Sequence, residues 1–478
     1  MGQLAIKSLA SIVLLTSLAI PQLKASVHQY TIEIDNNLNS AKVNICFDGR
    51  PPSYLAVESN LGNKDLIKFP HSKQGKIEIQ GRYWKTKYLP ADSCLNYRVS
   101  IKRYQAKRSK LKLRDKKIQV SYIEDNTWLW LPEKIADDDN IELLFNLPVW
   151  AEISTPWHQI NFSENRFLLG HQPQEWSYSI MIGDFDMAHY PISNGTMLNV
   201  ASIRGMKKKE KLHQWIRDTA KALENYLGEY PVKDTQVIVI PKTKKKHGPV
   251  PWGRLLRGNG MGILFVVIPD LPMEDFYTDW TATHEFSHML IPNLEWDNKW
   301  LSEGLASYLE YVLMAQSEWI SKEKAWIGIY EGLQRGEKGT EKLGRETLRA
   351  TARTRGRSHR GGSRMRIYWS GALYFIKADL ALRQQSNNKV GLSDILLKLN
   401  RCCVNHTKIW SGSFFAQKLD DLSNSKIFSD LYGEFWNGRS YPEYESTMKE
   451  LGVSVNPNHP EKLKIEKNSL AALIMELR

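Results

Sequence analysis

The stretch Thr283-His284-Glu285-Phe286-Ser287-His288 has the pattern of a metal-binding motif, and Glu303 follows it after 14 intervening residues. Residues four apart on an α-helix lie on one face, so His284 and His288 can present their imidazole nitrogens to one zinc ion. We expect Glu303 to supply the third ligand and Glu285 to point beside the metal toward a bound water. Three protein ligands leave a fourth position open, which separates a catalytic zinc site from a closed structural one.

The surroundings of this motif favour a metal site over a chance match. We expect a helix that begins near Met273 and is ended by Pro292, and a second helix over residues 300–314 with Glu303 in its first turn. Without a metal, two imidazoles and two carboxylates gathered at one place would be costly to bury. The pattern therefore predicts a single zinc ion as the cofactor.

Glu310 follows Glu303 by seven residues and falls on nearly the same face of the second helix. In that position it can accept a hydrogen bond from a ligand imidazole and orient the ring. The alternative is a glutamate that faces solvent.

Residues 284–310, HEFSHMLIPNLEWDNKWLSEGLASYLE, resemble the gluzincin peptidases, which include the alanyl and leucyl aminopeptidases and the glycyl aminopeptidase family. The segments 372–383 and 428–452 are most similar to the glycyl aminopeptidase family, although the PDZ domain that commonly ends its members has no room here. Aminopeptidases of this group keep more residues between the second histidine and the ligand glutamate than the 14 found here. The resemblance implies a zinc metallopeptidase that cleaves peptides or proteins with a metal-activated water.

Further along the chain, Tyr368-Trp369-Ser370-Gly371-Ala372 is similar to the Tyr-x-x-Gly-Ala segment that supplies a catalytic tyrosine in these families. An O–H donor near the zinc can stabilise the oxyanion of a tetrahedral intermediate. The resemblance thus gives Tyr368 a catalytic role beside Glu285. The alternative is a core tyrosine at the start of a helix, which we expect over residues 369–385.

The segment that would hold the substrate's free amine departs from the family pattern. These aminopeptidases place a Gly-x-Met-Glu-Asn segment ahead of the zinc helix, and its glutamate binds the amine. This chain has Gly258-Asn259-Gly260-Met261-Gly262, which carries no acid. Its glycines permit close approach of a peptide backbone, and a plain turn explains them equally well. Gly258, Asn259, Gly260, Met261 and Gly262 are therefore candidate substrate contacts, and the choice between aminopeptidase and endopeptidase stays open.

The fold class predicted is multidomain α+β. Residues 26–190 contain alternating runs at 30–34, 76–79, 97–101 and 141–145, which indicate an antiparallel, sandwich-like β domain. A thermolysin-like catalytic subdomain is expected over 195–320, with a helix over 207–227 stopped by Gly228 and buried strands at 235–240 and 262–268. An edge strand beside the zinc helix can take an extended peptide by β-augmentation. A helical subdomain over 321–456 and a tail over 457–478, with a short helix in 468–478, complete the chain.

The first 25 residues have the features of a secretory signal peptide. A basic start at Lys7 precedes an apolar run over residues 9–20, then Pro21 and a cleavage site after Ala25. The run falls short of the roughly 20 residues needed to span a bilayer, and no later segment is apolar enough. We therefore expect a periplasmic or secreted protein without a transmembrane segment in the mature chain.

Lys and Arg total 65 against 52 acidic residues, which gives a net charge of +13. This charge favours anionic surroundings such as a cell-envelope surface. Nucleic acid is disfavoured as a partner because export removes it and no binding motif accompanies the charge. Eight arginines lie in residues 345–366. Most such runs are solvated and mobile, and the alternative is a basic lid that attracts acidic peptides or envelope polymers.

The chain has four cysteines. Cys46 and Cys94 lie in or beside strand-like runs and are able to form a disulfide in an oxidising compartment. Adjacent Cys402 and Cys403 are expected to be free or buried, because a bond between neighbours is strained.

Together these features predict an exported zinc-dependent peptidase. The alternative, from another functional class, is a zinc-containing envelope protein that binds partners or serves as a scaffold without turnover. Cleavage of a peptide library that chelation abolishes and zinc restores separates the two.

Overall fold

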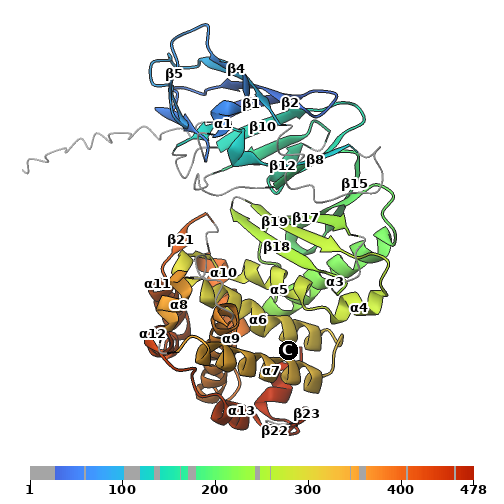
Figure 1. The fold of residues 1–478 in the computed structure, drawn as a ribbon, viewed down its shortest axis with the longest axis vertical. Helices are drawn as coiled ribbons and strands as arrows, with labels where there is room; N and C mark the ends of the chain where they lie inside the picture. The colour runs from blue at the N-terminus through green and yellow to red at the C-terminus, as the bar shows by residue number, and fades with distance from the viewer. Residues whose placement is uncertain are drawn as a thin grey trace, which may run out of the picture.

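The computed structural model describes residues 27–58, 61–101, 119–133, 140–161, 163–170, 179–242, 248–258, 260–344, 346–354, 362–404, 407–456 and 459–477. The fold is multidomain α+β, as predicted: a β domain, a second sheet and a helical region follow one another along the long axis of the molecule (Figure 1). The predicted signal peptide, residues 1–25, lies outside the described residues.

The β domain is built on a seven-stranded sheet of order β12-β13-β10-β1-β2-β7-β4, with smaller sheets β11-β14-β8 and β5-β6-β3-β9. Short helical turns lie at α1 (Leu61–Lys64) and η1 (Asp125–Thr127). The strands are β1 (Val27–Ile34), β2 (Ser40–Cys46), β3 (Tyr54–Ala56), β4 (Leu66–His71), β5 (Glu78–Gln80), β6 (Tyr83–Lys85), β7 (Cys94–Ser100), β8 (Val120–Glu124), β9 (Leu131–Pro132), β10 (Asn140–Asn146), β11 (Glu152–Ser154), β12 (His158–Asn161), β13 (Arg166–Leu169) and β14 (Ser179–Gly183).

The alternating runs at 30–34, 97–101 and 141–145 fall on β1, β7 and β10, where alternate side chains point into the core. The run at 76–79 overlaps the start of β5, whose Ile79 is exposed. One pairing differs from the antiparallel prediction. Strands β1 and β10, which are more than 100 residues apart in the sequence, pair in parallel, with Val27 opposite Asn140 and Glu33 opposite Asn146. Alternation fixes which face of a strand is buried, but it carries no information about the direction of its neighbour.

Both cysteine pairs are bonded. Cys46 and Cys94 lie opposite each other on β2 and β7 and form a disulfide. The expectation for Cys402 and Cys403 was wrong, since these neighbours are joined by a disulfide at the end of α10, where Cys402 is exposed. The prediction rested on the strain of a bond between neighbours, whereas these two residues lie at the exposed end of a helix.

The second sheet has the order β15-β16-β17-β19-β18, in which β16, β17 and β19 run parallel and the outer strands β15 and β18 run antiparallel. Its strands are β15 (Phe185–Pro191), β16 (Met197–Ile203), β17 (Asp234–Pro241), β18 (Trp252–Gly258) and β19 (Gly260–Val267). A short turn, η2 (Ser193–Gly195), joins β15 to β16. Strand β15, which lies within the range predicted for the first β domain, pairs with β16 of this sheet.

Both faces of this sheet are buried. On one face Val237 and Val239 pack with helix α3 (Lys209–Leu227) and the zinc-motif helix, and on the other Ile238 and Leu264 pack with Met181 of the β domain. Burial on both sides explains why β17 and β19 are continuous apolar runs. Helix α3 ends where expected, at Gly228, whose φ of +90° is the left-handed conformation that glycine adopts without strain.

The zinc-motif helix is shorter than predicted. Helix α4 (Met273–Thr278) ends at Asp279, a new helix α5 (Thr281–Ser287) follows, and the 3-10 turn η3 (His288–Leu290) continues it. The carboxylate of Asp279 accepts a hydrogen bond of 2.9 Å from the Thr281 backbone N–H, so it satisfies a donor that the new helix leaves open. The helix is therefore interrupted at Asp279, where the sequence pattern had indicated one continuous helix.

The helical region begins with α6 (Lys299–Gln316), close to the predicted 300–314. The other elements are β20 (Asn293–Leu294), η4 (Trp296–Asn298), α7 (Lys322–Glu341), α8 (Leu348–Thr354), α9 (Ser363–Gln385), α10 (Leu392–Cys402), β21 (Ile409–Trp410), α11 (Gly412–Ser423), α12 (Ile427–Asn437), α13 (Glu445–Leu451), β22 (Val453–Asn456), β23 (His459–Ile465) and α14 (Leu470–Ile474). None of the described helices is long and apolar enough to cross a bilayer.

The last residues pack onto the helical region. Ala471 and Ile474 are buried, and the indole N–H of Trp326 in α7 donates to the Ala471 carbonyl at 3.1 Å. The side-chain amide of Gln316 donates to the Ile474 carbonyl at 2.8 Å. The segment predicted as a tail therefore contributes to the core around α7.

Helices α6 and α9 touch through their backbones at Gly304 and Gly371. A Cβ on Gly304 would lie 2.1 Å from the Gly371 carbonyl carbon, and a Cβ on Gly371 would lie 2.1 Å from the Trp300 carbonyl oxygen. Both distances are far below van der Waals contact, so neither position has room for a side chain. Since Gly304 follows Glu303 and Gly371 lies three residues after Tyr368, this contact places both side chains at the same junction.

Replacing either glycine by alanine tests this contact. Gly304→Ala and Gly371→Ala are each expected to lower the free energy of unfolding by about 1–3 kcal/mol, because the added methyl forces the two backbones apart. Urea denaturation measures the change. Gly433→Ala is the control, because Gly433 lies inside α12 with no atom within 4 Å of its Cβ. There the substitution should stabilise the protein by about 0.5–1 kcal/mol. Equal effects at Gly304 and Gly433 would contradict the packing argument.

Candidate metal centre

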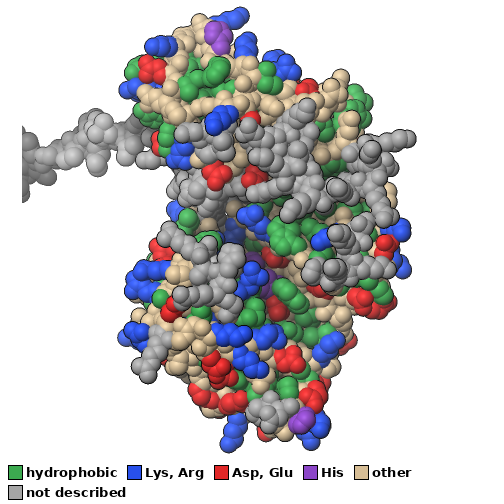
Figure 2. Space-filling model, in the orientation of Figure 1, with side chains coloured by type: hydrophobic (Ala, Val, Ile, Leu, Met, Phe, Trp, Pro, Cys, Tyr) green, Lys and Arg blue, Asp and Glu red, His purple; other side chains and the backbone are tan. Residues whose placement is uncertain are grey.

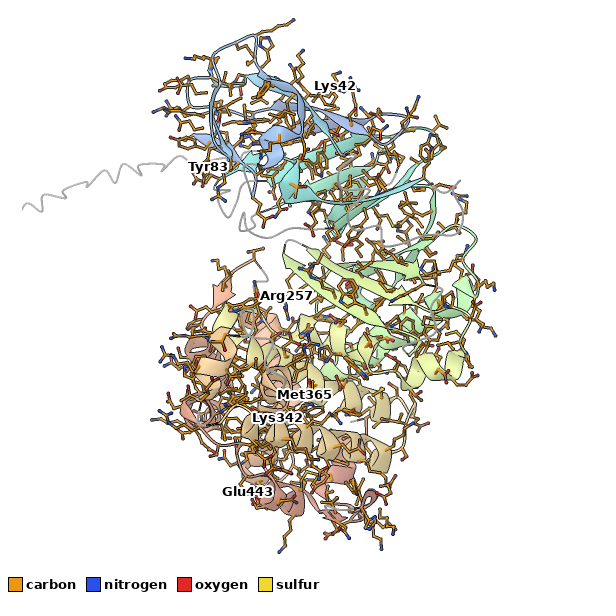
Figure 3. All side chains as sticks on the ribbon, viewed as in Figure 1. Lys42, Tyr83, Arg257, Lys342, Met365 and Glu443 are labelled. Atoms are coloured by element: carbon orange, nitrogen blue, oxygen red, sulfur yellow. A yellow bond between two sulfur atoms is a disulfide. The ribbon has the colours of Figure 1, made fainter. Side chains whose placement is uncertain are left out.

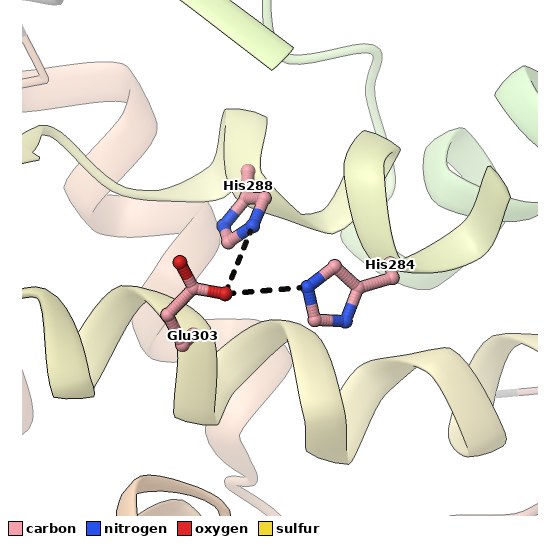
Figure 4. Close-up of side chains that lie close together, drawn as sticks. All are labelled: His284, His288 and Glu303. Carbon is pink, nitrogen blue, oxygen red and sulfur yellow. Dashed lines mark ion pairs between the residues drawn. The ribbon is translucent and has the colours of Figure 1, made fainter. Parts of the chain in front are cut away.

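Three predicted ligands meet at the junction of α5, η3 and α6 (Figure 4). The Nε2 atom of His284 lies 3.5 Å from Glu303 Oε2, and the Nε2 atom of His288 lies 3.8 Å from the same oxygen. The three ligand atoms all lie within 4.8 Å of one another. His284 begins the last turn of α5 and His288 begins η3, so the four-residue spacing still puts both rings on one side.

This geometry fits a zinc ion. Zinc bonds to His nitrogen and carboxylate oxygen of about 2.0–2.2 Å in tetrahedral arrangement put ligand atoms about 3.3–3.6 Å apart. The two nitrogen–oxygen distances are close to that range. Two imidazoles and one carboxylate are also the donor set of zinc sites that keep a coordination position open. Among the described residues, these three form the group able to hold a metal ion.

The charges around the group call for a cation. Glu310 is buried and Glu285 is partly buried beside the ligands, and burial raises the pKa of both carboxyls. Burial lowers the pKa of His284, but hydrogen bonds to Glu303 and Glu310 outweigh burial and raise that pKa to about 10. Buried carboxylates thus hold a positive charge at this point, which a divalent ion also supplies. Burial lowers the pKa of His288, which favours the neutral imidazole that binds metals.

Glu310 lies next to a ligand, so the solvent-facing alternative is wrong. Its Oε2 lies 2.7 Å from His284 Nδ1, and the Glu310 residue is only 5% exposed. With a metal bound at Nε2, the ring would be neutral, carry its proton on Nδ1 and donate it to the carboxylate. The hydrogen bond therefore fixes both the orientation of the His284 ring and the nitrogen that is free to bind.

The corresponding partner of His288 did not emerge from the sequence. Its Nδ1 lies 3.0 Å from the hydroxyl oxygen of Ser302. Arg257 of β18 donates to the same hydroxyl at 3.0 Å and to the His288 carbonyl oxygen at 2.6 Å. Burial lowers the pKa of Arg257 to about 10, so it keeps its charge at neutral pH. Ser302 stands inside the Trp-Leu-Ser-Glu-Gly segment, but Arg257 is 46 residues away from Glu303 and no local pattern connects them.

Glu285 is held against the edge strand. Its Oε2 accepts a hydrogen bond of 2.8 Å from the Leu255 backbone N–H. Gly253 lies directly opposite, where a Cβ would come within 2.8 Å of Glu285 Cγ, so the strand approaches the helix closely because this position is glycine. The raised pKa that burial gives Glu285 moves it toward the neutral range in which a general base works best.

Tyr368 lies beside the ligands, in the second turn of α9. Its ring is nearly parallel to that of His284, with centroids 5.9 Å apart. The helix begins at Ser363, so Tyr368 does not start it, and the residue lines the same cavity as the metal group. Trp280 lies on another side of His284, edge to face at 5.3 Å.

A cavity of about 540 Å³ contains the metal group. Its lining comes from β18 and the residues before it, α5, the start of α6 and the start of α9: Val250, Pro251, Trp252, Gly253, Arg254, Leu255, Arg257, Trp280, Thr281, His284, Glu285, His288, Asn293, Leu294, Lys299, Ser302, Glu303, Arg364 and Tyr368. In Figure 2 a histidine is visible at the bottom of a hollow in the molecule, with Lys and Arg side chains around it.

The candidate substrate segment lies elsewhere. Gly258 and Gly260 pair with each other where β18 meets β19, Met261 is buried in the core, and Gly262 packs on Gln236. Asn259 lies outside the described residues. A Cβ on Gly260 would meet the Pro156 carbonyl oxygen, so this glycine permits contact with the β domain. The four described residues are not part of the cavity lining, whose strand contribution comes from Trp252 to Arg257 instead.

Strand β18 presents an open edge to this cavity. It is the last strand of its sheet, and its pairing partner is β19. In an antiparallel pair, residues with backbone groups toward the partner alternate with residues whose groups point away. Because the Leu255 N–H points to Glu285, the outward set is Gly253, Leu255 and Arg257. Glu285 already takes the Leu255 N–H, and a peptide can add to the remaining outward groups as a further strand.

Comparison with solved structures shows which known proteins share this architecture. An aminopeptidase N family protein from Idiomarina loihiensis aligns with a TM-score of 0.67 at 15% identity, over 90% of this chain and 79% of that one. An M1 zinc metallopeptidase from Deinococcus radiodurans aligns with a TM-score of 0.53 at 14% identity, over 88% of this chain and 94% of that one. The chain has the fold of the two-domain M1 peptidases. A variant of the Deinococcus enzyme bound to a Tyr-Ser-Ala substrate aligns similarly, with a TM-score of 0.52. No family model and no curated protein matches the sequence.

Substitution of Glu310 tests the metal centre. Glu310→Gln should weaken zinc binding about 10–100-fold, because the amide no longer offers His284 a charged acceptor. Competition with a coloured chelator measures the affinity. Glu331→Gln, on the exposed side of α7, is the matched control and should bind zinc like the wild type. Unchanged affinity in Glu310→Gln would mean that this carboxylate does not support the ligand.

Proposed function

We propose that this protein is a zinc-dependent peptidase. The observation that carries the proposal is the meeting of His284, His288 and Glu303 in one cavity with Glu285, Tyr368 and an open strand edge. Neither the metal group nor the strand edge alone indicates a peptidase. A metal group without a strand edge fits many hydrolases, and a strand edge without a metal group fits a binding protein.

His284, His288 and Glu303 would hold the zinc, which when bound supplies a Lewis acid and a more acidic water. Glu285 would accept the proton of the attacking water and pass it to the leaving amine. The bond from the Leu255 N–H holds one oxygen of that carboxylate and leaves the other for the proton. Tyr368 would donate its O–H to the oxyanion that forms at the attacked carbonyl. The edge of β18 would align the peptide.

The proposal includes a family relation, a cellular location and the kind of surface around the protein. Similarity of segments 372–383 and 428–452 supports a relation to the glycyl aminopeptidase family. A place outside the cytoplasm, periplasmic or secreted, is supported by the signal-like residues 1–25 and by the two disulfides, which oxidising compartments favour. The net charge of +13 supports an anionic envelope surface as the surroundings.

Glu285→Gln is expected to retain zinc and to lose hydrolysis by about 100-fold or more, because the amide cannot accept the proton. Metal content by elemental analysis and cleavage of a peptide library measure the two properties. Chelation should abolish cleavage by the wild type, and zinc should restore it. Glu323→Gln, on the exposed first turn of α7, is the control. Full activity in zinc-replete Glu285→Gln would refute the assigned base, and a zinc-loaded wild type that binds peptides without cutting them would indicate a scaffold protein.

Tyr368→Phe removes only a hydroxyl. We expect kcat to fall about 100-fold with KM nearly unchanged, because the bond to the oxyanion forms only in the transition state. Steady-state kinetics on a cleaved peptide measure both constants. Tyr88→Phe, an exposed tyrosine of the β domain, serves as the control. A rise in KM at constant kcat would show that Tyr368 binds substrate instead.

A further inference from the structure

The cavity of the metal centre is rich in cations. Its lining holds Arg254, Arg257, Lys299 and Arg364, against the two carboxylates of Glu285 and Glu303. These cations come from β18 and from the first turns of α6 and α9, which are far apart in the sequence. Figure 3 shows labelled Arg257 where the second sheet meets the helices. A substrate that enters this cavity therefore meets positive charge from several directions.

Both carboxylates of the cavity lining already have a role in the proposed mechanism. Glu303 belongs to the metal group, and Glu285 is held by the Leu255 N–H in position for the base. Among the described residues of the lining no acid remains to bind a free amine. A protonated N-terminus would instead be repelled by the cations around it.

Arg257 is bound to the protein's own framework through the His288 carbonyl and Ser302. The other three differ from it in exposure. Arg254 and Arg364 are exposed, and the half-buried ammonium of Lys299 lies over the Trp296 ring at 5.2 Å. We assign to Arg257 a positioning role and to the other three the contact with a ligand.

Two of these cations stand one helical turn before a residue of the site. Lys299 precedes Glu303 by four residues in α6, and Arg364 precedes Tyr368 by four residues in α9. Residues four apart share a face of a helix, so each cation lies about 6 Å along the axis from the site residue that follows it. An extended peptide advances about 3.3 Å per residue. A carboxylate bound there would lie one or two residues from the bond that is cut.

The placement of these cations runs against local helix preference. The first turn of a helix carries a partial positive charge and favours acidic side chains. Helices α6 and α9 instead begin with Lys299 and Arg364 and have no acid in the first turn. Departures from local preference are expected at functional sites, where a ligand supplies the missing charge.

We infer that the site selects peptides through a carboxylate one or two residues from the scissile bond, and that it does not require a free N-terminal amine. This inference rests on the proposed function, because it concerns which peptides the same cavity accepts. The carboxylate comes from an Asp or Glu side chain or from the C-terminus of a short peptide. Both carry the same charge and geometry toward an Arg or Lys donor.

Matched peptides test the inference. Starting from a library peptide that the wild type cuts, N-acetylated pairs carry Glu or Gln at the first and second positions on either side of the bond. A second set carries a C-terminal carboxylate or amide at the same distances. We expect kcat/KM to be about tenfold or more higher for the acid of the favoured pair, because a bond to a charged group is lost in the amide. Acetylation of the N-terminus should not lower it.

Substitutions connect the preference to the cations. Arg364→Gln and Lys299→Gln should each bring the acid-to-amide ratio of kcat/KM closer to one. Arg50→Gln, at an exposed position in the β domain, should leave the ratio as in the wild type. Retention of the full ratio in both cavity variants would overturn the assignment of these cations.

Binding without turnover separates the two proposals. Zinc-loaded Glu285→Gln is titrated with fluorescein-labelled peptides that carry Glu or Gln, or a C-terminal carboxylate or amide, and anisotropy gives Kd. Tighter binding of acids that Arg364→Gln removes would support the cation site even if the wild type cut no peptide. Equal Kd values and equal kcat/KM for acids and amides would overturn the cation site and leave the peptidase proposal intact. A requirement for a free N-terminus would overturn it as well.

Discussion

The contact between Gly304 and Gly371 is the constraint on which the site depends. Helices α6 and α9 meet there without side chains between them, since a Cβ at either position would overlap the other backbone. The meeting brings a metal ligand from one helix and the candidate oxyanion donor from the other into the same cavity. A similar close approach at Gly253 brings β18 against the helix that carries Glu285. Two small residues in the helices and one in the strand thus set how near the three elements come.

Electrostatic balance explains the remaining arrangement. Glu310 is buried and Glu285 and Glu303 are partly buried, so their carboxylates would destabilise the fold if positive charge did not lie among them. Arg257 supplies part of that charge, and it also fixes His288 through the carbonyl oxygen and through Ser302. One side chain of the edge strand therefore supports both the charge balance and the ligand geometry. Strand β18 and the metal centre are thus joined through the hydrogen bonds of Arg257.

Local patterns predicted much of the site, and long-range pairing accounts for what they missed. Spacing indicated that His284, His288 and Glu303 could meet, because helical periodicity carries that information within a few residues. Tyr368 came from the family resemblance, and the sequence left a solvent-facing position of Glu310 equally open. Strand β18 was not predicted, because residues 252–257 do not alternate between apolar and polar side chains and one face of the strand lies at the cavity. The Gly-rich segment 258–262 resembles a substrate loop in composition, whereas its glycines serve a hairpin and a contact with Pro156. The break at Asp279 and the parallel pairing of β1 with β10 depend on a single capping bond and on distant partners, which periodicity does not encode.

The bond from the Leu255 N–H to Glu285 has a consequence for any chain that lies along β18. That donor is already engaged, so an added strand finds an interrupted ladder rather than a uniform one. In every two-residue register, the backbone carbonyl of the added strand that lies opposite Leu255 finds no donor there and has to be satisfied by water or another group. The carboxylate proposed as the base therefore shortens the stretch of β18 that can hold a peptide backbone.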